Sequence, residues 1–179
     1  MAEPSRLACA ASAALSVMLL VAACSGGATS SGPTTAVPLD GTPRYPDAEG
    51  IVVDIADDFS TITLDGDRTF EINEDVQSFS TVDGSVQQLL RRKGQYVQVG
   101  LKEGYVRWIA GIAAVVRAPG QPPVVYYSGN LVEVRGEHAV FEDGTVLTLS
   151  EELDAPPTGA RYTATISADE HVVISLSRA

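Results

Sequence analysis

The alternation of apolar and polar residues from Gly50 onward is the feature that most restricts the fold of this chain. Successive side chains of a β-strand point to opposite faces of a sheet, so a period of two predicts strands. The segments with this period are residues 51–55, 61–64, 69–72, 96–101 and 105–116. Between two of them, Asp65-Gly66-Asp67 is typical of a tight turn, because glycine accepts a positive φ angle without steric cost. We therefore predict a mainly β protein, with a small antiparallel meander that closes into a barrel or sandwich.

A second, similar set of segments follows the first. The matches are 129–134 with 50–55, 139–144 with 62–67, 147–153 with 70–76, and more loosely Gly159 and Tyr162 with Gly94 and Tyr96. This recurrence predicts a tandem duplication of a small β unit. The first unit covers residues 47–118 and the second residues 124–179, with the proline-rich segment 119–123 as the joint.

The first unit differs from the second by a short predicted helix over residues 83–93. Asp83 or Ser85 is suited to begin it, and Gly94 is suited to end it. Three strands, a helix and two strands is the order of an OB-fold. The second unit lacks the helix and fits a small SH3-like barrel equally well. The sequence leaves open whether the units are separate domains or one continuous β layer.

The first residues of the chain have a different character. Residues 1–23 combine a short first region, an apolar stretch and small residues, as export signals do. The quartet Val21-Ala22-Ala23-Cys24 resembles the lipobox of bacterial lipoproteins. The resemblance implies that a signal peptidase cuts before Cys24, and that Cys24 carries a covalent diacylglyceryl lipid as the new N-terminus. We expect no other cofactor.

This resemblance implies a cellular location and a membrane anchor. The chain would be held at the extracytoplasmic face of the cell membrane by its lipid. Residues 24–46 are rich in Ser, Thr, Gly and Pro and predict a disordered tether. Cys9 would leave with the signal and Cys24 would be acylated, so the mature chain would have no free thiol. Thiol catalysis and a cysteine zinc site are then excluded.

The charge of the chain restricts its partners. The formal net charge is −11, which argues against binding to the phosphates of nucleic acid. As a binding partner, an envelope protein or a cell-wall glycan fits the predicted extracytoplasmic location better.

Four aspartates in turns are candidate cation ligands: Asp57, Asp58, Asp65 and Asp67. Calcium prefers several oxygen ligands at once, which these turns offer. The alternative is that they are solvated turn residues that keep a small β protein soluble.

Trp108, with Tyr105 and Arg107, is a candidate platform for a ligand. The alternative is that these strand-borne aromatic residues pack into the core. The two histidines, His138 and His171, lack metal-ligand spacing, and no familiar catalytic motif occurs. We therefore predict that the protein is not an enzyme but a non-catalytic binding module for a protein, glycan or cation. The alternatives are a structural or assembly subunit that pairs through a sheet edge, and a carboxylate-dependent hydrolase.

Overall fold

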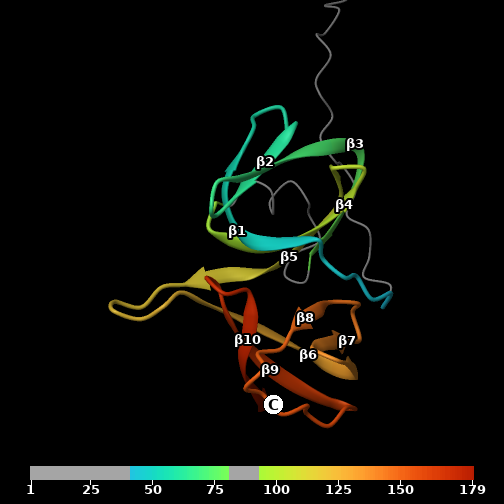
Figure 1. Ribbon diagram of the computed structural model, residues 1–179, viewed down its shortest axis with the longest axis vertical. Coiled ribbons are helices and arrows are strands. Elements are labelled where there is room, and N and C mark those ends of the chain that lie inside the picture. The colour runs from blue at the N-terminus through green and yellow to red at the C-terminus, as the bar shows by residue number, and fades with distance from the viewer. Residues whose placement is uncertain (1–40, 81–92) are drawn as a thin grey trace, which may run out of the picture.

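The computed structural model of the chain describes residues 41–80 and 93–179 (Figure 1). The predicted signal peptide, Cys24 and the helix predicted over 83–93 lie outside the described residues, apart from Lys93 at the end of the predicted helix. The described residues form ten strands and no helix, which confirms the prediction of a mainly β protein. They are β1 (Ala48–Ile55), β2 (Thr61–Leu64), β3 (Arg68–Ser80), β4 (Gln95–Lys102), β5 (Tyr105–Val116), β6 (Val124–Arg135), β7 (His138–Phe141), β8 (Val146–Thr148), β9 (Ala160–Ser167) and β10 (Val172–Arg178). In this part of the chain, nothing has the length and apolar character of a membrane-spanning helix.

The strands β1 to β5 form a closed barrel. Strand β1 pairs with β2 and β4, β3 pairs with β2 and β5, and β4 pairs with β5. Every strand of the ring therefore has two neighbours. The β3–β5 pair is parallel and the other pairs are antiparallel. Figure 1 shows this ring above the later strands. The predicted barrel is confirmed, and its closure depends on a parallel pair that a simple meander does not contain.

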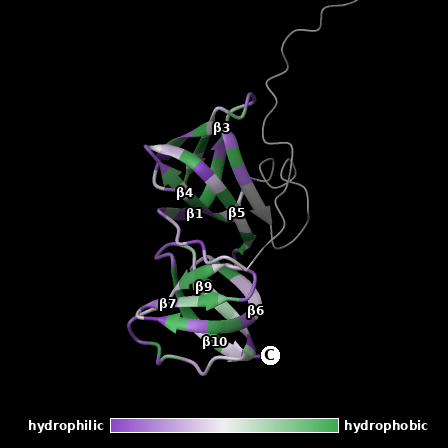
Figure 2. Ribbon diagram, turned by 90° about the vertical axis from the view of Figure 1, so that its right-hand side faces the viewer, coloured by the Kyte–Doolittle hydropathy of each residue, from purple (hydrophilic) through white to green (hydrophobic). Residues whose placement is uncertain are grey.

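The interior of this barrel is aliphatic. Alternate residues of each strand point inward, as the period of two requires. The buried members of this core are Val52, Ile62, Leu64, Val76, Val97, Val99, Val106 and Ile109. In Figure 2 the strands carry most of the apolar residues, whereas the turns are hydrophilic.

The strands β6 to β10 form a second unit. Strand β6 pairs with β7 and β9, β7 pairs with β8, and β9 pairs with β10. A single parallel bridge between Leu149 and Val173 links the end of β8 to β10. Strand β5 leaves the first barrel and pairs with β6 through Val115 and Val116, so both units belong to one hydrogen-bonded sheet.

The two units share details of strand register. Val52 of β1 pairs with Leu64 of β2, and Leu131 of β6 pairs with Phe141 of β7. In both pairs the register then slips by a β-bulge at the next residue of the longer strand.

A matching backbone hydrogen bond holds the start of the fourth strand in each unit. The amide of Gly94 donates to the carbonyl of Val52, and the amide of Gly159 donates to the carbonyl of Leu131, both at 2.8 Å. Both glycines have a positive φ angle, of 87° and 80° respectively. Glycine adopts this conformation without strain, which explains why it stands at both positions.

The two units are joined by a shared core. Ile51, Tyr96 and Ile112 come from the first barrel, yet they belong to the same buried cluster as Leu131 and Phe141 of the second unit. Their neighbours in sequence, such as Val97, point into the first barrel. The outer face of the first barrel therefore closes one side of the core of the second unit.

The residues before β1 contact the second unit. The amide of Arg44 donates to the carbonyl of Gly144 at 2.9 Å, and its guanidinium donates to the carbonyl of Asp143 at 3.1 Å. The Tyr45 ring meets the edge of the His138 ring, with centroids 5.4 Å apart. These residues belong to the segment 24–46 that the sequence predicts as a tether, and its last residues are held against β7 and β8.

We expect the shared core to make the two units unfold together. Replacement of Ile112 by Ala removes a side chain that is 1 % exposed, and such losses cost about 2–5 kcal/mol of unfolding free energy. Val132→Ala, at a position that is 50 % exposed, is the matched control and should change stability by less than about 0.5 kcal/mol. Thermal and urea unfolding, followed by circular dichroism, should show one transition in both variants. Two separated transitions would contradict a shared core.

Candidate functional site

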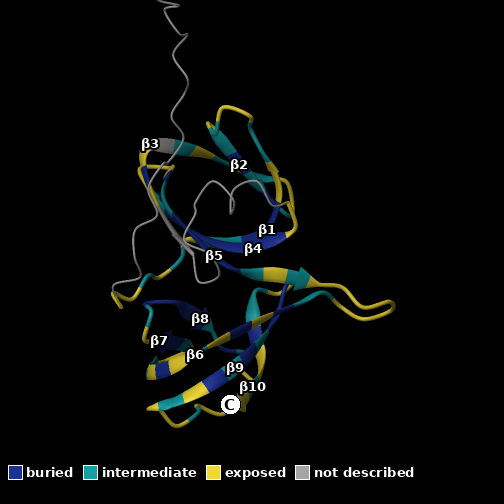
Figure 3. Cartoon of the chain, turned by 180° about the vertical axis from the view of Figure 1, so that it is seen from behind, coloured by how far each residue is buried: buried dark blue, intermediate teal, exposed yellow. Residues whose placement is uncertain are grey.

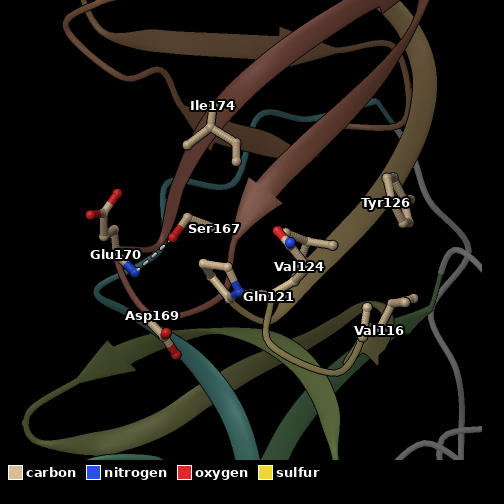
Figure 4. Close-up of a pocket in the computed structure, with 10 residues that line it drawn as sticks. Val116, Gln121, Val124, Tyr126, Ser167, Asp169, Glu170 and Ile174 are labelled. Carbon is tan, nitrogen blue, oxygen red and sulfur yellow. Dashed lines mark hydrogen bonds between the residues drawn. The ribbon is translucent and has the colours of Figure 1, made fainter.

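A groove on the second unit is the strongest candidate for a binding site. Its volume is about 590 Å³. We call it the arm groove, because one wall is the arm formed by residues 117–123 between β5 and β6. Its lining residues are Val116, Ala118, Gln121, Pro122, Val124, Tyr126, Ser167, Asp169, Glu170 and Ile174, which Figure 4 draws as sticks.

The arm projects from the body of the protein. All of its residues but Pro123 are exposed, and Figure 3 shows the loop in yellow beyond the end of β5. The three prolines, Pro119, Pro122 and Pro123, restrict the backbone of the arm because the proline ring holds φ close to one value. The arm is therefore exposed and stiffer than its length suggests.

A second wall is the turn between β9 and β10, which contacts the arm directly through a bond from the Ala168 amide to the carbonyl of Pro123 at 3.0 Å. The amide of His171 donates to the carbonyl of Ser167 at 2.9 Å, and the amide of Glu170 donates to the Ser167 hydroxyl at 3.3 Å (Figure 4). His171 has a φ angle of 59°, which is uncommon for a residue other than glycine. These bonds hold the turn in a defined shape.

Large apolar side chains in the arm groove are exposed. Val116, Tyr126 and Ile174 are 46 %, 51 % and 44 % exposed. Among the described residues, seven large hydrophobic side chains are exposed, and these three share one groove. Exposed hydrophobic side chains that share one groove are candidates for contact with another molecule.

The two charged residues among the ten that line the arm groove are both acidic, and Arg117 at the start of the arm is exposed but is not among these ten. Asp169 and Glu170 are exposed on the β9–β10 turn, and no Lys, Arg or His is among the ten residues that line the groove. Figure 4 shows the two carboxylates pointing in different directions from the turn. The groove therefore offers an apolar floor beside negative charge.

A buried polar network lies behind this turn, where the two units meet. The Tyr96 hydroxyl and the Gln98 side-chain amide both donate to Oε2 of Glu49, each at 3.1 Å. Gln98 also donates to the carbonyl of Val146 at 2.7 Å. Nδ1 of His171 lies 3.3 Å from the Tyr96 hydroxyl oxygen. The network thus connects β1 and β4 of the first barrel to β8 and the β9–β10 turn of the second unit.

Burial sets the protonation of this network. It raises the pKa of Glu49, although the hydrogen bonds from Gln98 and Tyr96 partly offset the effect. Burial also raises the pKa of Tyr96 and lowers the pKa of His171. At neutral pH His171 is therefore neutral. Because the Tyr96 proton is donated to Glu49, the tautomer that fits has its proton on Nδ1, donated to the Tyr96 oxygen.

One atom of the network is incompletely satisfied. Oε1 of Gln98 is buried and has no hydrogen-bond partner among the residues that the structure describes. Both protons of the Gln98 amide are already used, by Glu49 and by Val146. A buried polar atom without a partner costs free energy, so the junction is held together mainly by the apolar cluster around it.

The predicted aromatic site lies elsewhere, on β5 in the first barrel. Tyr105 is exposed, and Arg107 and Trp108 are partly buried. Trp108 pairs with Gly100 of β4, and a Cβ atom at Gly100 would overlap the Trp108 indole. The tryptophan ring therefore lies flat on β4, and none of the three residues lines the arm groove. Ligand binding by these residues stays a prediction.

The four predicted cation ligands lie in two separate turns. Asp57 and Asp58 precede β2 and Asp65 and Asp67 follow it, so about 13 Å of strand separates the pairs. Asp58 accepts hydrogen bonds from Ser60, and Asp65 accepts one from the amide of Ile51. Within residues 41–80 and 93–179, no three potential ligands gather closely enough to hold a metal ion. A single ion cannot reach both pairs, and calcium binding by either pair stays a prediction.

Sequence reasoning missed the arm groove because its parts are far apart in the chain. The arm, β6 and the β9–β10 turn each look like ordinary strand or loop residues on their own. The one available signal was the pair Tyr126-Tyr127 directly after the prolines, because alternation places these two side chains on opposite faces. Tyr127 is buried, whereas Tyr126 is exposed in the groove.

Comparison with known proteins finds no matching family, no matching curated protein and no matching solved structure.

The raised pKa of Glu49 has a consequence for stability. As pH rises above the unfolded-state pKa of Glu49, the unfolded chain loses its proton before the folded protein does, so the unfolding free energy falls. Glu49→Gln removes this contribution. We expect the stability of the native protein relative to Glu49→Gln to decrease between pH 4 and pH 7 in urea unfolding curves, within about the range where carboxylates titrate.

Glu71→Gln is the matched control, since Glu71 is an exposed strand residue. Its stability relative to the native protein should not change in this way over the same range. His171 is present in all three proteins, so its own titration largely cancels in the comparison. A difference between native protein and Glu49→Gln that stays constant with pH would contradict the assignment.

Proposed function

We propose that this chain is a lipid-anchored extracytoplasmic protein that binds a partner at the arm groove and carries out no reaction. The observation that carries the proposal is the gathering of Val116, Tyr126 and Ile174, all exposed, in one groove. Water contact with this much clustered apolar surface is unfavourable, and a partner that covers it gains free energy. The volume of the groove lies within the range of known binding sites.

The anchor in this proposal rests on Cys24 and the three residues before it. A diacylglyceryl group on Cys24 places two acyl chains in the membrane, which is enough for stable attachment. The segment after Cys24 then lets the folded part reach a partner beside the membrane, such as an envelope protein or a glycan of the cell wall.

We further propose that both units are OB-like and arose by tandem duplication. The first barrel supports this with the pairing order β1–β2–β3–β5–β4–β1 and a parallel β3–β5 pair. In the second unit, β6 to β10 pair in the corresponding order, and the parallel bridge of Leu149 with Val173 takes the place of the β3–β5 pair. The shared bulges and the bonds of Gly94 and Gly159 support a common origin.

A structural role in an envelope assembly is the second candidate. The observation in its favour is the edge of β10. Past Val173, β10 pairs only with β9 among the described strands. An open edge of this kind accepts a strand from another protein.

Cys24→Ala tests the anchor. We expect the native protein, expressed in a bacterial host that modifies lipoproteins, to partition into the detergent phase, and the variant to remain in the aqueous phase. Cys9→Ala is the matched control and should partition as the native protein does. Continued partitioning of Cys24→Ala into detergent would overturn lipidation at this residue.

A photo-crosslinking amino acid at position 126 tests binding at the arm groove. In intact cells we expect a discrete crosslinked product of higher mass. The same group at position 132 is the control, because Val132 is 50 % exposed and Tyr126 is 51 % exposed. Equal products from both positions, or none from position 126, would contradict a binding site in the groove. A crosslinker at Ser177 on β10 that gave the main product would favour pairing through the strand edge.

A further inference from the structure

We propose that the partner of the arm groove is a protein segment in extended conformation that carries apolar side chains next to lysine or arginine. This inference rests on the proposed function and gives the chemistry of the partner. The groove combines two features that a basic and apolar segment satisfies together: exposed hydrophobic side chains, and carboxylates without a basic neighbour in the lining.

The apolar part of the partner is set by the floor of the groove. Val124 and Tyr126 lie on β6, and Ile174 lies on β10, with β9 between these strands. In Figure 4 Ile174 and Tyr126 lie above Val124 and Gln121. The apolar side chains of the groove therefore come from three elements, the end of β5, β6 and β10, and a segment in extended conformation can contact all of them.

The basic part of the partner is set by the β9–β10 turn. Asp169 and Glu170 line the groove from this turn, which adjoins the arm because the amide of Ala168 donates to the carbonyl of Pro123 at 3.0 Å. Because these carboxylates point in different directions, a lysine or arginine of the bound segment pairs with one of them, partly shielded from water by the apolar contact beside it. The whole chain carries a formal charge of −11, which also speeds the approach of a basic partner.

The walls of the groove are held in place before the partner arrives. Ser167 fixes the shape of the turn, and His171, the next residue after Glu170, contacts the buried Tyr96 hydroxyl at 3.3 Å. The three prolines restrict the backbone of the arm. A site that is already formed loses less conformational entropy on binding.

Charge also decides between the partner segment and other occupants. A second copy of this chain would bring another net charge of −11 to an acidic groove. Anionic lipid head groups are repelled for the same reason. A basic protein segment meets no such repulsion.

The test measures binding of synthetic peptides to the full lipidated chain in neutral detergent. The probe is a short fluorescein-labelled peptide in which Val, Leu and Pro alternate with Lys and Arg. One comparison peptide replaces Lys and Arg by Glu, and another replaces the apolar residues by Ser. Fluorescence anisotropy at physiological salt gives the dissociation constants.

We expect the basic, apolar peptide to bind and both comparison peptides to bind at least about tenfold more weakly. Ile174→Ser, and Asp169→Asn combined with Glu170→Gln, should each weaken binding of the first peptide by about tenfold. The matched controls are Val132→Ser and the pair Glu151→Gln with Glu152→Gln. Glu151 and Glu152 are also two adjacent exposed carboxylates of the second unit. The backbone amide of Glu152 donates to the Ser150 hydroxyl, as that of Glu170 donates to the Ser167 hydroxyl. Circular dichroism checks that each variant is folded.

Several results would overturn the inference. Equal loss of binding in the Asp169–Glu170 and Glu151–Glu152 variants would show attraction by net charge alone. Tighter binding of the acidic peptide would reverse the proposed chemistry. A dimer in solution that Ile174→Ser abolishes would assign the groove to a second copy. If position 126 crosslinks to a partner in cells while no peptide binds, the chemistry of the segment is wrong and the proposed binding function stands. Without crosslink or peptide binding, both fail.

Discussion

Burial of both faces of β4 is the constraint on which the rest of the structure depends. Val97 and Val99 fill the first barrel, whereas Tyr96 and Gln98 face the second unit. A strand covered on both sides cannot be exposed on either without loss of a core, so the two units are held together as the barrel forms. Strand β5 connects the two units, because it pairs with β4 from Tyr105 to Ala114 and with β6 through Val115 and Val116.

The same constraint shapes the candidate site. Covering the outer face of β4 also encloses the Tyr96 hydroxyl, the Gln98 amide and the carboxylate of Glu49, and the first two groups both donate to Glu49. His171 completes that arrangement from the β9–β10 turn. The turn is thereby fixed to the first barrel, and its carboxylates stand at a defined place beside the apolar floor of the arm groove. The junction between the two units and the arm groove therefore share the β9–β10 turn.

Much of the fold could be predicted from local pattern. Alternation and the Asp-Gly turns predicted a mainly β protein, and the structure confirms that class and the barrel. The site was harder to predict, because alternation states that two faces differ but not what covers each face. Tyr96 and Tyr126 both occupy alternating strand positions, yet the first is 0 % exposed and the second 51 %. The four turn aspartates are near each other in sequence, but β2 holds them apart.

Local residue patterns were enough to predict where strands form and where the chain turns, and to find a lipobox-like quartet before the folded part. These properties depend on residues a few positions apart, so they can be predicted from short stretches of the sequence. Only the tertiary structure decided the parallel β3–β5 pair, the shared core around Ile51, Tyr96 and Ile112, and the meeting of the arm with the β9–β10 turn. Those features join residues that are distant in the chain, and each is selected by the total apolar area that the whole molecule buries. No local pattern contains that information.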